Sequence, residues 1–334
     1  EGILLINLDD PEQCQWLASN VGDALSIGHS ELKHLKPDDM DLPQEDTIEE
    51  ITNAVVTGLT DYCRKSGITS VVLGLSGGID SAVAACVAVE AIGPANVTGL
   101  AMPSRHSSQH SIDDALYTAQ SLGMNHQLHS IDSMHQATEL EIGDVLTSGQ
   151  AVAGENLQAR LRALLVMGYA NAQSSMAITT GNKSEIAQGY CTLYGDMAGG
   201  YAPLGDVYKM EVYAMAELFN KRAIAAGREP PVNRSTMTKP PSAELAPDQI
   251  DEDTLPPYAL LDELLRAHIE DGMNADQMIE AGYEEALVID VLSRLERNEH
   301  KRWQMAPAPR VTSRAFGQGW RRPLASRHDW RSSL

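Results

Sequence analysis

The sequence predicts an α/β protein built on a doubly wound parallel sheet, Rossmann-like, with a helical C-terminal region. Short apolar, β-branched runs alternate with segments of helical period between residues 47 and 226. Such alternation is typical of parallel strands joined by right-handed helical crossovers. Beyond Gly227 the apolar runs stop and helical patterns return only after a long gap. Because doubly wound sheets bind ligands at the carboxyl ends of their strands, we expect the functional site there.

The first predicted helix begins at a capping box, Thr47-Ile48-Glu49-Glu50, and its apolar residues recur at helical spacing until Gly67. The run Val71–Leu75 is short and β-branched, as expected of a buried strand. Ala82–Ala91 contains strong helix formers, so a helix over about 80–92 follows that strand. By the same criteria, further strands are predicted at 97–102, 125–131 and 176–179, and further helices at 112–122, 155–173 and 207–226.

The two ends of the chain read differently from its middle. Residues 1–46 open with the strand-like run Ile3–Ile6 and then become acidic and irregular, so we interpret them as a lead-in or linker remnant before a domain at 47–334. Residues 230–257 are rich in Pro, Ser, Thr and Asp without an apolar period. Loops of this length often cover a substrate, and we expect a lid. Helices are predicted at 258–270 and 275–298, before a basic, proline-broken tail.

Composition excludes several classes of protein. The 334 residues include 46 acidic and 25 basic ones, a balance that argues against a nucleic-acid partner but not against nucleotides. No run of 18 apolar residues occurs, so no membrane span is expected. The four cysteines show no C-x-x-C spacing, which argues against a zinc site or a disulfide framework and favours a reducing cytoplasm.

The turn after the first strand, Ser76-Gly77-Gly78-Ile79-Asp80-Ser81, is the strongest candidate site. It places small residues at a helix N-terminus, where unpaired backbone N–H groups and the helix dipole attract anions. We therefore expect a phosphate or pyrophosphate here. The alternative is a plain glycine turn with Asp80 capping the helix. No lysine follows as in G-x-x-x-x-G-K-[ST], which excludes an ordinary P-loop.

Other charged residues fall at strand ends or helix starts. Thr179–Glu185 is a second strand, turn and helix start, and Glu185 paired with Asp80 makes a two-carboxylate magnesium site, if it does not merely complement the helix dipole. Lys209 starts the next long helix, either as a surface lysine or as a cation for leaving phosphates. Arg105 follows the second strand and is either a surface residue or a donor to phosphate or ribose oxygens.

Several blocks together resemble a known family. The S-G-G-x-D-S turn matches the ATP pyrophosphatase superfamily, and the chain from about 47 to about 330 resembles the synthetase domain of NAD synthetase, an adenine nucleotide α-hydrolase-like fold. Four blocks resemble the glutamine-dependent subtype: Met102–Arg105, Pro241–Leu245, Leu255–Tyr258 and the tail from Lys301 through Val311–Gly317. In that subtype a nitrilase-like glutaminase domain comes first. Because 46 residues cannot hold it, we expect an excised domain or a separate source of ammonia, such as a glutaminase subunit.

The resemblance implies a reaction and a set of roles. Nicotinic acid adenine dinucleotide, ATP and ammonia would give NAD, AMP and pyrophosphate, with Mg²⁺ and a homodimeric enzyme. The implied ATP ligands are Ser76, Gly77, Gly78, Asp80, Ser81, Arg105, Thr180, Lys209 and Ser242. The implied ligands of the deamido dinucleotide are Asn156, Arg160 and Lys183, those of Mg²⁺ are Asp80 and Glu185, and the catalytic group comprises Asp80, Lys209 and Asp196, the last for ammonium.

Two rival interpretations remain at this point. One is another ATP pyrophosphatase, such as a GMP synthetase or a tRNA-modifying enzyme, although thiolating members need reactive cysteines and a basic tRNA surface that this chain lacks. The other is a regulatory module that holds ATP without turnover. Such a module needs no pair of metal ligands beside a cation for a leaving group, so Asp80, Glu185 and Lys209 argue against it.

Overall fold

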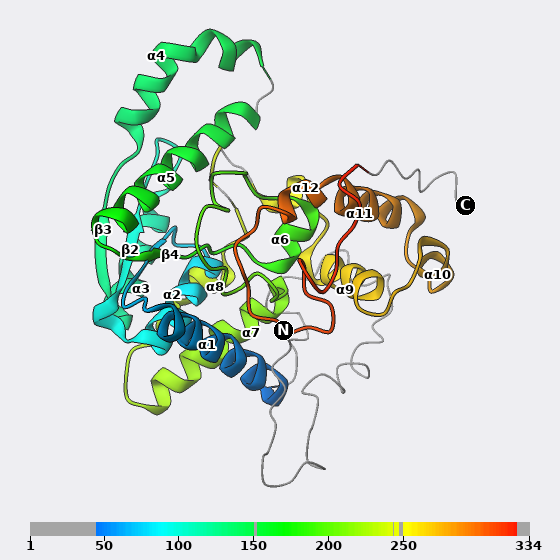
Figure 1. Ribbon diagram of the computed structural model, residues 1–334, viewed down its shortest axis with the longest axis horizontal. Coiled ribbons are helices and arrows are strands. Elements are labelled where there is room, and N and C mark those ends of the chain that lie inside the picture. The colour runs from blue at the N-terminus through cyan, green and yellow to red at the C-terminus, as the bar shows by residue number, and fades with distance from the viewer. Residues whose placement is uncertain (1–44, 150–151, 243, 247–249, 326–334) are drawn as a thin grey trace.

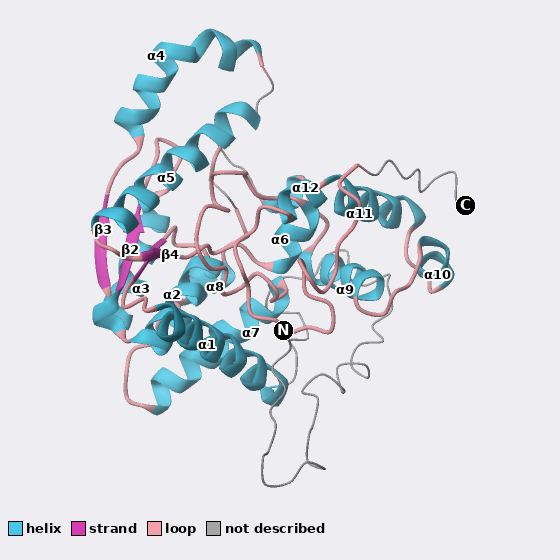
Figure 2. Cartoon of the chain, viewed as in Figure 1, coloured by secondary structure: helices cyan, strands magenta, loops and turns pink. Residues whose placement is uncertain are grey.

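The computed structural model describes residues 45–149, 152–242, 244–246 and 250–325. Its centre is a parallel sheet of four strands in the order β3-β2-β1-β4 (Figure 1, Figure 2). The predicted α/β class with a parallel sheet is therefore confirmed. The strands are β1 (Val71–Gly74), β2 (Val97–Ala101), β3 (Asn125–Leu128) and β4 (Met176–Ala177).

Helices make up most of the remaining described chain. Those of the sheet region are α1 (Glu45–Ser66), α2 (Ile79–Ile92), α3 (Gln109–Leu122), α4 (Asp132–Ser148), α5 (Val152–Ala172), α6 (Lys183–Gln188) and α7 (Lys209–Ala225). After them come α8 (Arg234–Thr238), α9 (Tyr258–Ile269), α10 (Ala275–Glu280), α11 (Glu285–Arg297) and α12 (Glu299–Arg302). Two 3₁₀ turns, η4 (Pro94–Asn96) and η5 (Asp251–Asp253), complete the set.

The central strand β1 is buried on both faces. Val71 and Leu73 point into a core shared with α1, α2 and α7, while Val72 points into a second core with Leu161 and Val166 of α5. Alternate residues of a strand face opposite sides of a sheet, so an all-apolar strand needs helices on both. The apolar run that predicted this strand follows from that double burial.

A third core lies in the helical region formed by α9, α10 and α11, which α6 joins through Ala187. Leu261 and Leu265 of α9 pack there against Val288 and Leu292 of α11. Both α6 and α7 contact α9, so these two helices connect the sheet region to the helical region (Figure 1). The core of the sheet region and the core of the helical region therefore meet at the starts of α6 and α7.

Some predicted boundaries are wrong. The single helix predicted at 275–298 is two helices, because Gly282 between them has a positive φ of 103° that a helix cannot contain. The strands predicted to reach 131 and 179 end at Leu128 and Ala177. Helix α4 was not predicted at all. Of its apolar side chains, Leu140 and Val145 are exposed, so it lacks the buried stripe that reveals a helix in a sequence.

The stretch predicted as a long loop, 230–257, contains the short helix α8 and the turn η5 where it is described. The expected strand Ile3–Ile6 and nearly all of the lead-in 1–46 lie outside the described residues. Within the described chain, no helix is long and apolar enough to cross a membrane.

Candidate active site

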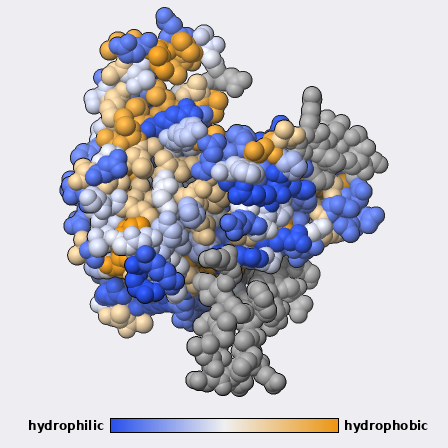
Figure 3. All heavy atoms as spheres, in the orientation of Figure 1, coloured by the Kyte–Doolittle hydropathy of each residue, from blue (hydrophilic) through white to orange (hydrophobic). Residues whose placement is uncertain are grey.

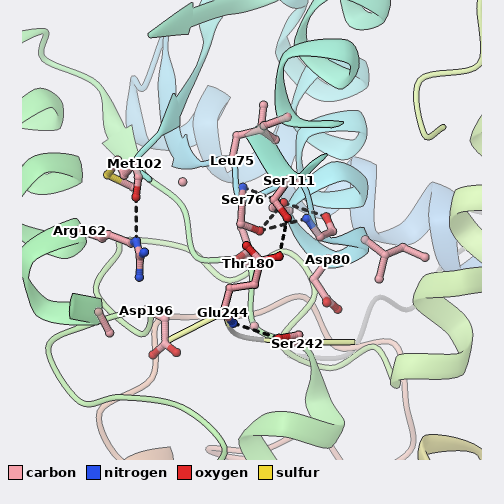
Figure 4. Close-up of a pocket in the computed structure, with 18 of the residues that line it drawn as sticks. Leu75, Ser76, Asp80, Met102, Ser111, Arg162, Thr180, Asp196, Ser242 and Glu244 are labelled. Carbon is pink, nitrogen blue, oxygen red and sulfur yellow. Dashed lines mark hydrogen bonds between the residues drawn. The ribbon is translucent and has the colours of Figure 1, made fainter. Parts of the chain in front are cut away.

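A cavity of about 300 Å³ opens at the carboxyl ends of the strands (Figure 4). The segments that follow β1, β2 and β4 form one side of it, with Ser76, Met102 and Thr180 among its lining. Described residues between Thr236 and Leu245, together with Asp251, form another side, which includes Ser242. The site is therefore where a doubly wound sheet is expected to bind its ligand, and part of the predicted lid lies against it.

The turn between β1 and α2 is held by its own hydroxyls. Ser81 Oγ donates to the Gly78 carbonyl (2.9 Å) and accepts from the Ser76 amide (3.2 Å), while the Gly78 amide donates to Ser76 Oγ (3.2 Å). Gly77 has a φ of 80°, and a Cβ there would lie 2.2 Å from the Ser111 carbonyl oxygen. Two side chains and two glycines thus hold the start of α2 open toward the cavity, as an anion site requires.

A buried lysine joins the two predicted metal ligands. Lys209, the first residue of α7, has a side chain that is only 2% exposed. Its Nζ lies 2.5 Å from Asp80 Oδ2, on α2, and 3.3 Å from Glu185 Oε1, on α6. Asn182 caps α6 and also donates its Nδ2 to Asp80 Oδ1 (2.8 Å). Three helix starts therefore converge on one point of the cavity.

This cluster sets two carboxyl groups against one lysine. Burial and the neighbouring Asp80 carboxylate raise the pKa of Glu185 to about 8, although Lys209 opposes the shift. Burial also opposes the charge on Lys209, but Asp80 and Glu185 outweigh it and raise the pKa of the lysine. A carboxyl group with a pKa of about 8 is largely protonated at neutral pH, and a further cation beside Asp80 and Glu185 would stabilise the ionised form of both. Magnesium fits, because it needs only one or two carboxylates when phosphate oxygens complete its shell.

Larger metal sites are absent from the part of the chain that the structure describes, where no group of three or more His, Cys, Asp or Glu side chains could hold a metal ion. A magnesium ion held by Asp80 and Glu185 would therefore depend on oxygens from a ligand. Binding of the ion and of a phosphate-bearing substrate would then be coupled at this point of the cavity.

The wall opposite the glycine turn carries Asp196 and Arg162 (Figure 4). Asp196 is exposed to solvent, but its Oδ1 accepts the Thr192 amide (2.6 Å) and the loop around its carboxylate partly desolvates it, which raises its pKa. Arg162 Nε donates to the Met102 carbonyl (3.0 Å), and burial lowers the pKa of its guanidinium. An acid and a cation therefore face the cavity on the side away from Lys209.

The loop after α8 is fastened across the cavity by Glu244. Its Oε1 accepts from Lys239 Nζ (2.5 Å) and Ser111 Oγ (2.7 Å), and its own amide donates to Ser242 Oγ (3.1 Å). Although burial favours the protonated acid, these hydrogen bonds outweigh it and lower the pKa of Glu244. These contacts hold part of the predicted lid against α3 at the edge of the cavity.

The cavity brings most of the predicted site residues together and leaves four outside. Lining it are Ser76, Gly77, Gly78, Asp80, Ser81, Thr180, Glu185, Asp196, Lys209 and Ser242. Arg105 instead pairs with Glu139 of α4 (2.9 Å). Arg160 donates to the Leu193 carbonyl (3.2 Å), and Asn156 accepts from Thr192 (2.7 Å).

Lys183 is the clearest departure from the sequence-based prediction. Its side chain is fully buried and pairs with Asp206 (2.9 Å), and it donates to Thr312 Oγ1 (2.6 Å) in the C-terminal segment. It is not among the cavity-lining residues. In this structure Lys183 therefore holds that segment against α6 and does not line the cavity.

Arg162 lines the cavity although the sequence did not mark it as a site residue. The residues expected on α5 were Asn156 and Arg160, whereas the face of α5 that lines the cavity carries Ala159, Arg162 and Val166. These three have helical spacing, and two of them are apolar. This spacing could have identified Arg162 in the sequence, because a polar residue that lies on the same helical face as buried apolar residues points into the core or into a cavity.

Comparison with known proteins gives a consistent result. Residues 51–305 match the family model described as NAD synthase. The glutamine-dependent NAD(+) synthetase of Synechocystis sp. is 45% identical over 285 residues, which cover 85% of this chain and 50% of that protein. The chain thus spans about half the length of the curated relatives it matches.

Solved structures agree. The glutamine-dependent NAD+ synthetase from Acinetobacter baumannii, in complex with ADP, is 37% identical with a TM-score of 0.57, covering 85% of this chain and 51% of that one. The NH3-dependent NAD synthetase from Campylobacter jejuni is 28% identical with a TM-score of 0.61, covering 78% and 96%.

Proposed function

We propose that this chain, which belongs to the NAD synthase family, forms NAD by ATP-dependent amidation of nicotinic acid adenine dinucleotide, with AMP and pyrophosphate as the other products. The observation that carries the proposal is the convergence of Asp80, Glu185 and Lys209 beside the glycine turn. A carboxylate is a poor electrophile and must first be activated. A phosphate-binding helix start next to buried charges that can hold magnesium and neutralise a leaving pyrophosphate suits that activation.

The first step transfers AMP to the substrate. A carboxylate oxygen of the nicotinate attacks the α-phosphorus of ATP, the bond to the β-phosphate breaks, and pyrophosphate leaves. In our proposal the turn Ser76–Ser81 binds the departing phosphates through its backbone amides, and Lys209 neutralises their charge. Asp80 and Glu185 would hold magnesium, which would supply further positive charge beside those phosphates. No enzyme nucleophile takes part.

The second step forms the amide. Ammonia attacks the acyl carbon, the acyl–oxygen bond breaks, and AMP leaves with the original carboxylate oxygen. The nitrogen loses a proton, which Asp196 could accept, because a pKa raised to about 6 suits an acid that binds ammonium and exchanges protons near neutral pH. Arg162, on the same wall, is a second candidate contact for the substrate. Catalysis then rests on positioning and charge neutralisation.

The nitrogen source is testable with the chain alone. Incubated with ATP, Mg²⁺, the deamido dinucleotide and ammonium, the protein should produce NAD, AMP and pyrophosphate in equal amounts, measured by chromatography. Glutamine in place of ammonium should give no NAD, because burial raises the pKa of the described cysteines Cys63, Cys86 and Cys191, so none of them supplies the thiolate that would release ammonia from glutamine. Two alternative substrates are tested beside it: nicotinate mononucleotide, which carries the same carboxylate, and xanthosine monophosphate, whose ring carbonyl oxygen would be adenylated instead.

Two results would contradict the proposal. Pyrophosphate release only with xanthosine monophosphate would assign a GMP synthetase, and ATP binding without turnover of any carboxylate would assign a binding module. NAD formation from glutamine at the rate seen with ammonium would refute the inference about the nitrogen donor.

We also propose that the protein works as a homodimer. Exposed apolar side chains gather on the arm formed by α4 and α5 (Figure 3), where Leu140 is 87%, Val145 68% and Leu164 62% exposed. Patches of this kind on a surface often mark interfaces. Asn156 and Arg160, the expected dinucleotide ligands, lie on α5 but outside the cavity, so a second copy packed on this arm could enclose them.

Sedimentation velocity tests the dimer. The protein should sediment at twice the chain mass of 36.2 kDa, and the double variant L140D/L164D at the chain mass. A monomeric wild-type protein would rule the dimer out. A glutaminase partner and the cytoplasmic location expected from the cysteine spacing remain predictions.

A further inference from the structure

The first turn of α7 is capped by residues from two other helices. Its first two amides belong to Lys209 and Met210, and an α-helix offers such amides no partner of its own. The preceding residue, Tyr208, provides no side-chain cap. Instead, the Lys209 amide donates to Ser184 Oγ (3.0 Å) and the Met210 amide donates to Asp262 Oδ2 (2.9 Å).

Ser184 and Asp262 are also bonded to each other. Ser184 Oγ donates to Asp262 Oδ1 at 2.5 Å. The Asp262 carboxylate therefore accepts two hydrogen bonds, one from the Met210 amide and one from Ser184 Oγ, which itself accepts the Lys209 amide. Asp262 is 3% exposed and Ser184 is fully buried. Burial raises the pKa of Asp262 to about 7, whereas the positive end of α7 favours its ionised form.

The position of this network gives it a role beyond packing. Ser184 directly precedes Glu185, one of the two carboxylates that face Lys209 Nζ, and Asp262 binds the residue that follows Lys209. Asp262 therefore fixes α6 and α7 relative to each other at the two residues from which the charged centre is built. It does so from α9, in the separate core of the helical region.

We propose that Asp262 is a positioning residue that acts through Ser184 and the first turn of α7 to hold Lys209 where it meets the phosphates of ATP. The inference rests on the proposed function only in assigning Lys209 to those phosphates. Lys209 Nζ already lies 2.5 Å from Asp80 and 4.9 Å from the centre of the Tyr258 ring. A shift of the helix start by about 1 Å would remove the lysine from that arrangement, and displacements of this size can cost about 100-fold in rate.

The test is a double-mutant cycle on ATP affinity, measured by isothermal titration calorimetry with Mg²⁺ and unlabelled ATP. D262A should weaken ATP binding about tenfold, and S184A should weaken it in the same direction. D262N should lose about threefold or less, because the amide keeps an oxygen for Met210 and a polar group for Ser184. In a K209M background, D262A should change the affinity less than twofold, since the two residues act as one unit.

The matched control is D114N. Asp114 is likewise a buried aspartate that accepts from another segment, through Asn233 and Ser235, but it has no bond to α6 or α7. D114N should bind ATP like the wild type, with any effect confined to the thermal unfolding temperature. Circular dichroism establishes that each variant is folded, and S184A, which removes one oxygen, carries the test if D262A does not fold.

The outcomes separate the two proposals. A folded D262A or S184A protein with wild-type ATP affinity would overturn the positioning role, as would equal losses from D262A with and without Lys209. A wild-type chain that bound no ATP would overturn the proposed function itself, and the role of Asp262 with it.

Discussion

Replacing Lys209 with methionine should lower kcat for NAD formation by about 10³-fold. Methionine has a similar length and is apolar, so it fits the buried site but leaves Asp80 and Glu185 without their cation. In the proposed reaction the lysine stabilises charge on the departing pyrophosphate, and removing a single group of this kind typically costs about 10²–10³ in kcat. Steady-state assays of NAD with saturating ATP and ammonium measure the effect.

A surface lysine provides the control. Lys65 of α1 pairs only with Asp61 at an exposed site, so K65M should leave NAD formation unchanged. If K209M kept kcat within tenfold of the wild type while remaining folded, the lysine would not be acting on the leaving group, and the mechanism proposed for the first step would be wrong.

Replacing Gly77 with alanine should cost about 3 kcal/mol of folding free energy and abolish measurable ATP binding. The new Cβ would lie 2.2 Å from the Ser111 carbonyl oxygen and 2.8 Å from its carbon, both backbone atoms that cannot rotate away. The positive φ of 80° adds about 1 kcal/mol or more of strain for a residue with a side chain. Either α3 or the turn must move, and both line the cavity.

Gly227 is the control that distinguishes the steric contact with Ser111 from the strain of a positive φ. It has a positive φ of 67°, but a Cβ there meets nothing within 4 Å. G227A should therefore lose only about 1 kcal/mol in denaturant unfolding and keep wild-type ATP affinity. Equal stability losses in the two variants would mean that backbone strain, and not the contact with Ser111, explains the need for Gly77.

The sheet and the glycine turn could be predicted because local chemistry determines them. Val71–Leu75 is apolar at every position since β1 is buried on both faces, and the turn that follows needs small residues to leave the start of α2 open. Short-range signals of this kind are visible in any single sequence. They identified where the cavity lies and which of its residues carry charge at Asp80, Glu185 and Lys209.

The remaining features depend on contacts between distant segments. Lys183 was predicted to bind substrate, but its partners Asp206 and Thr312 lie 23 and 129 residues further along the chain. Arg162 faces the cavity because of the rotation of α5 about its axis, which packing against the sheet decides. The bond from Asp262 to the start of α7 spans 52 residues and gives no periodic signal. Such pairings are fixed by tertiary packing.

The central claim is that this cavity activates a carboxylate by transferring AMP to it, and isotope transfer tests that claim most directly. Nicotinic acid adenine dinucleotide labelled with ¹⁸O in its carboxylate should be converted with ATP, Mg²⁺ and ammonium, and the products analysed by mass spectrometry. We expect one labelled oxygen in AMP for each NAD formed and none in pyrophosphate. Label in inorganic phosphate, with ADP as the nucleotide product, would show that an acyl phosphate forms instead and would contradict the account.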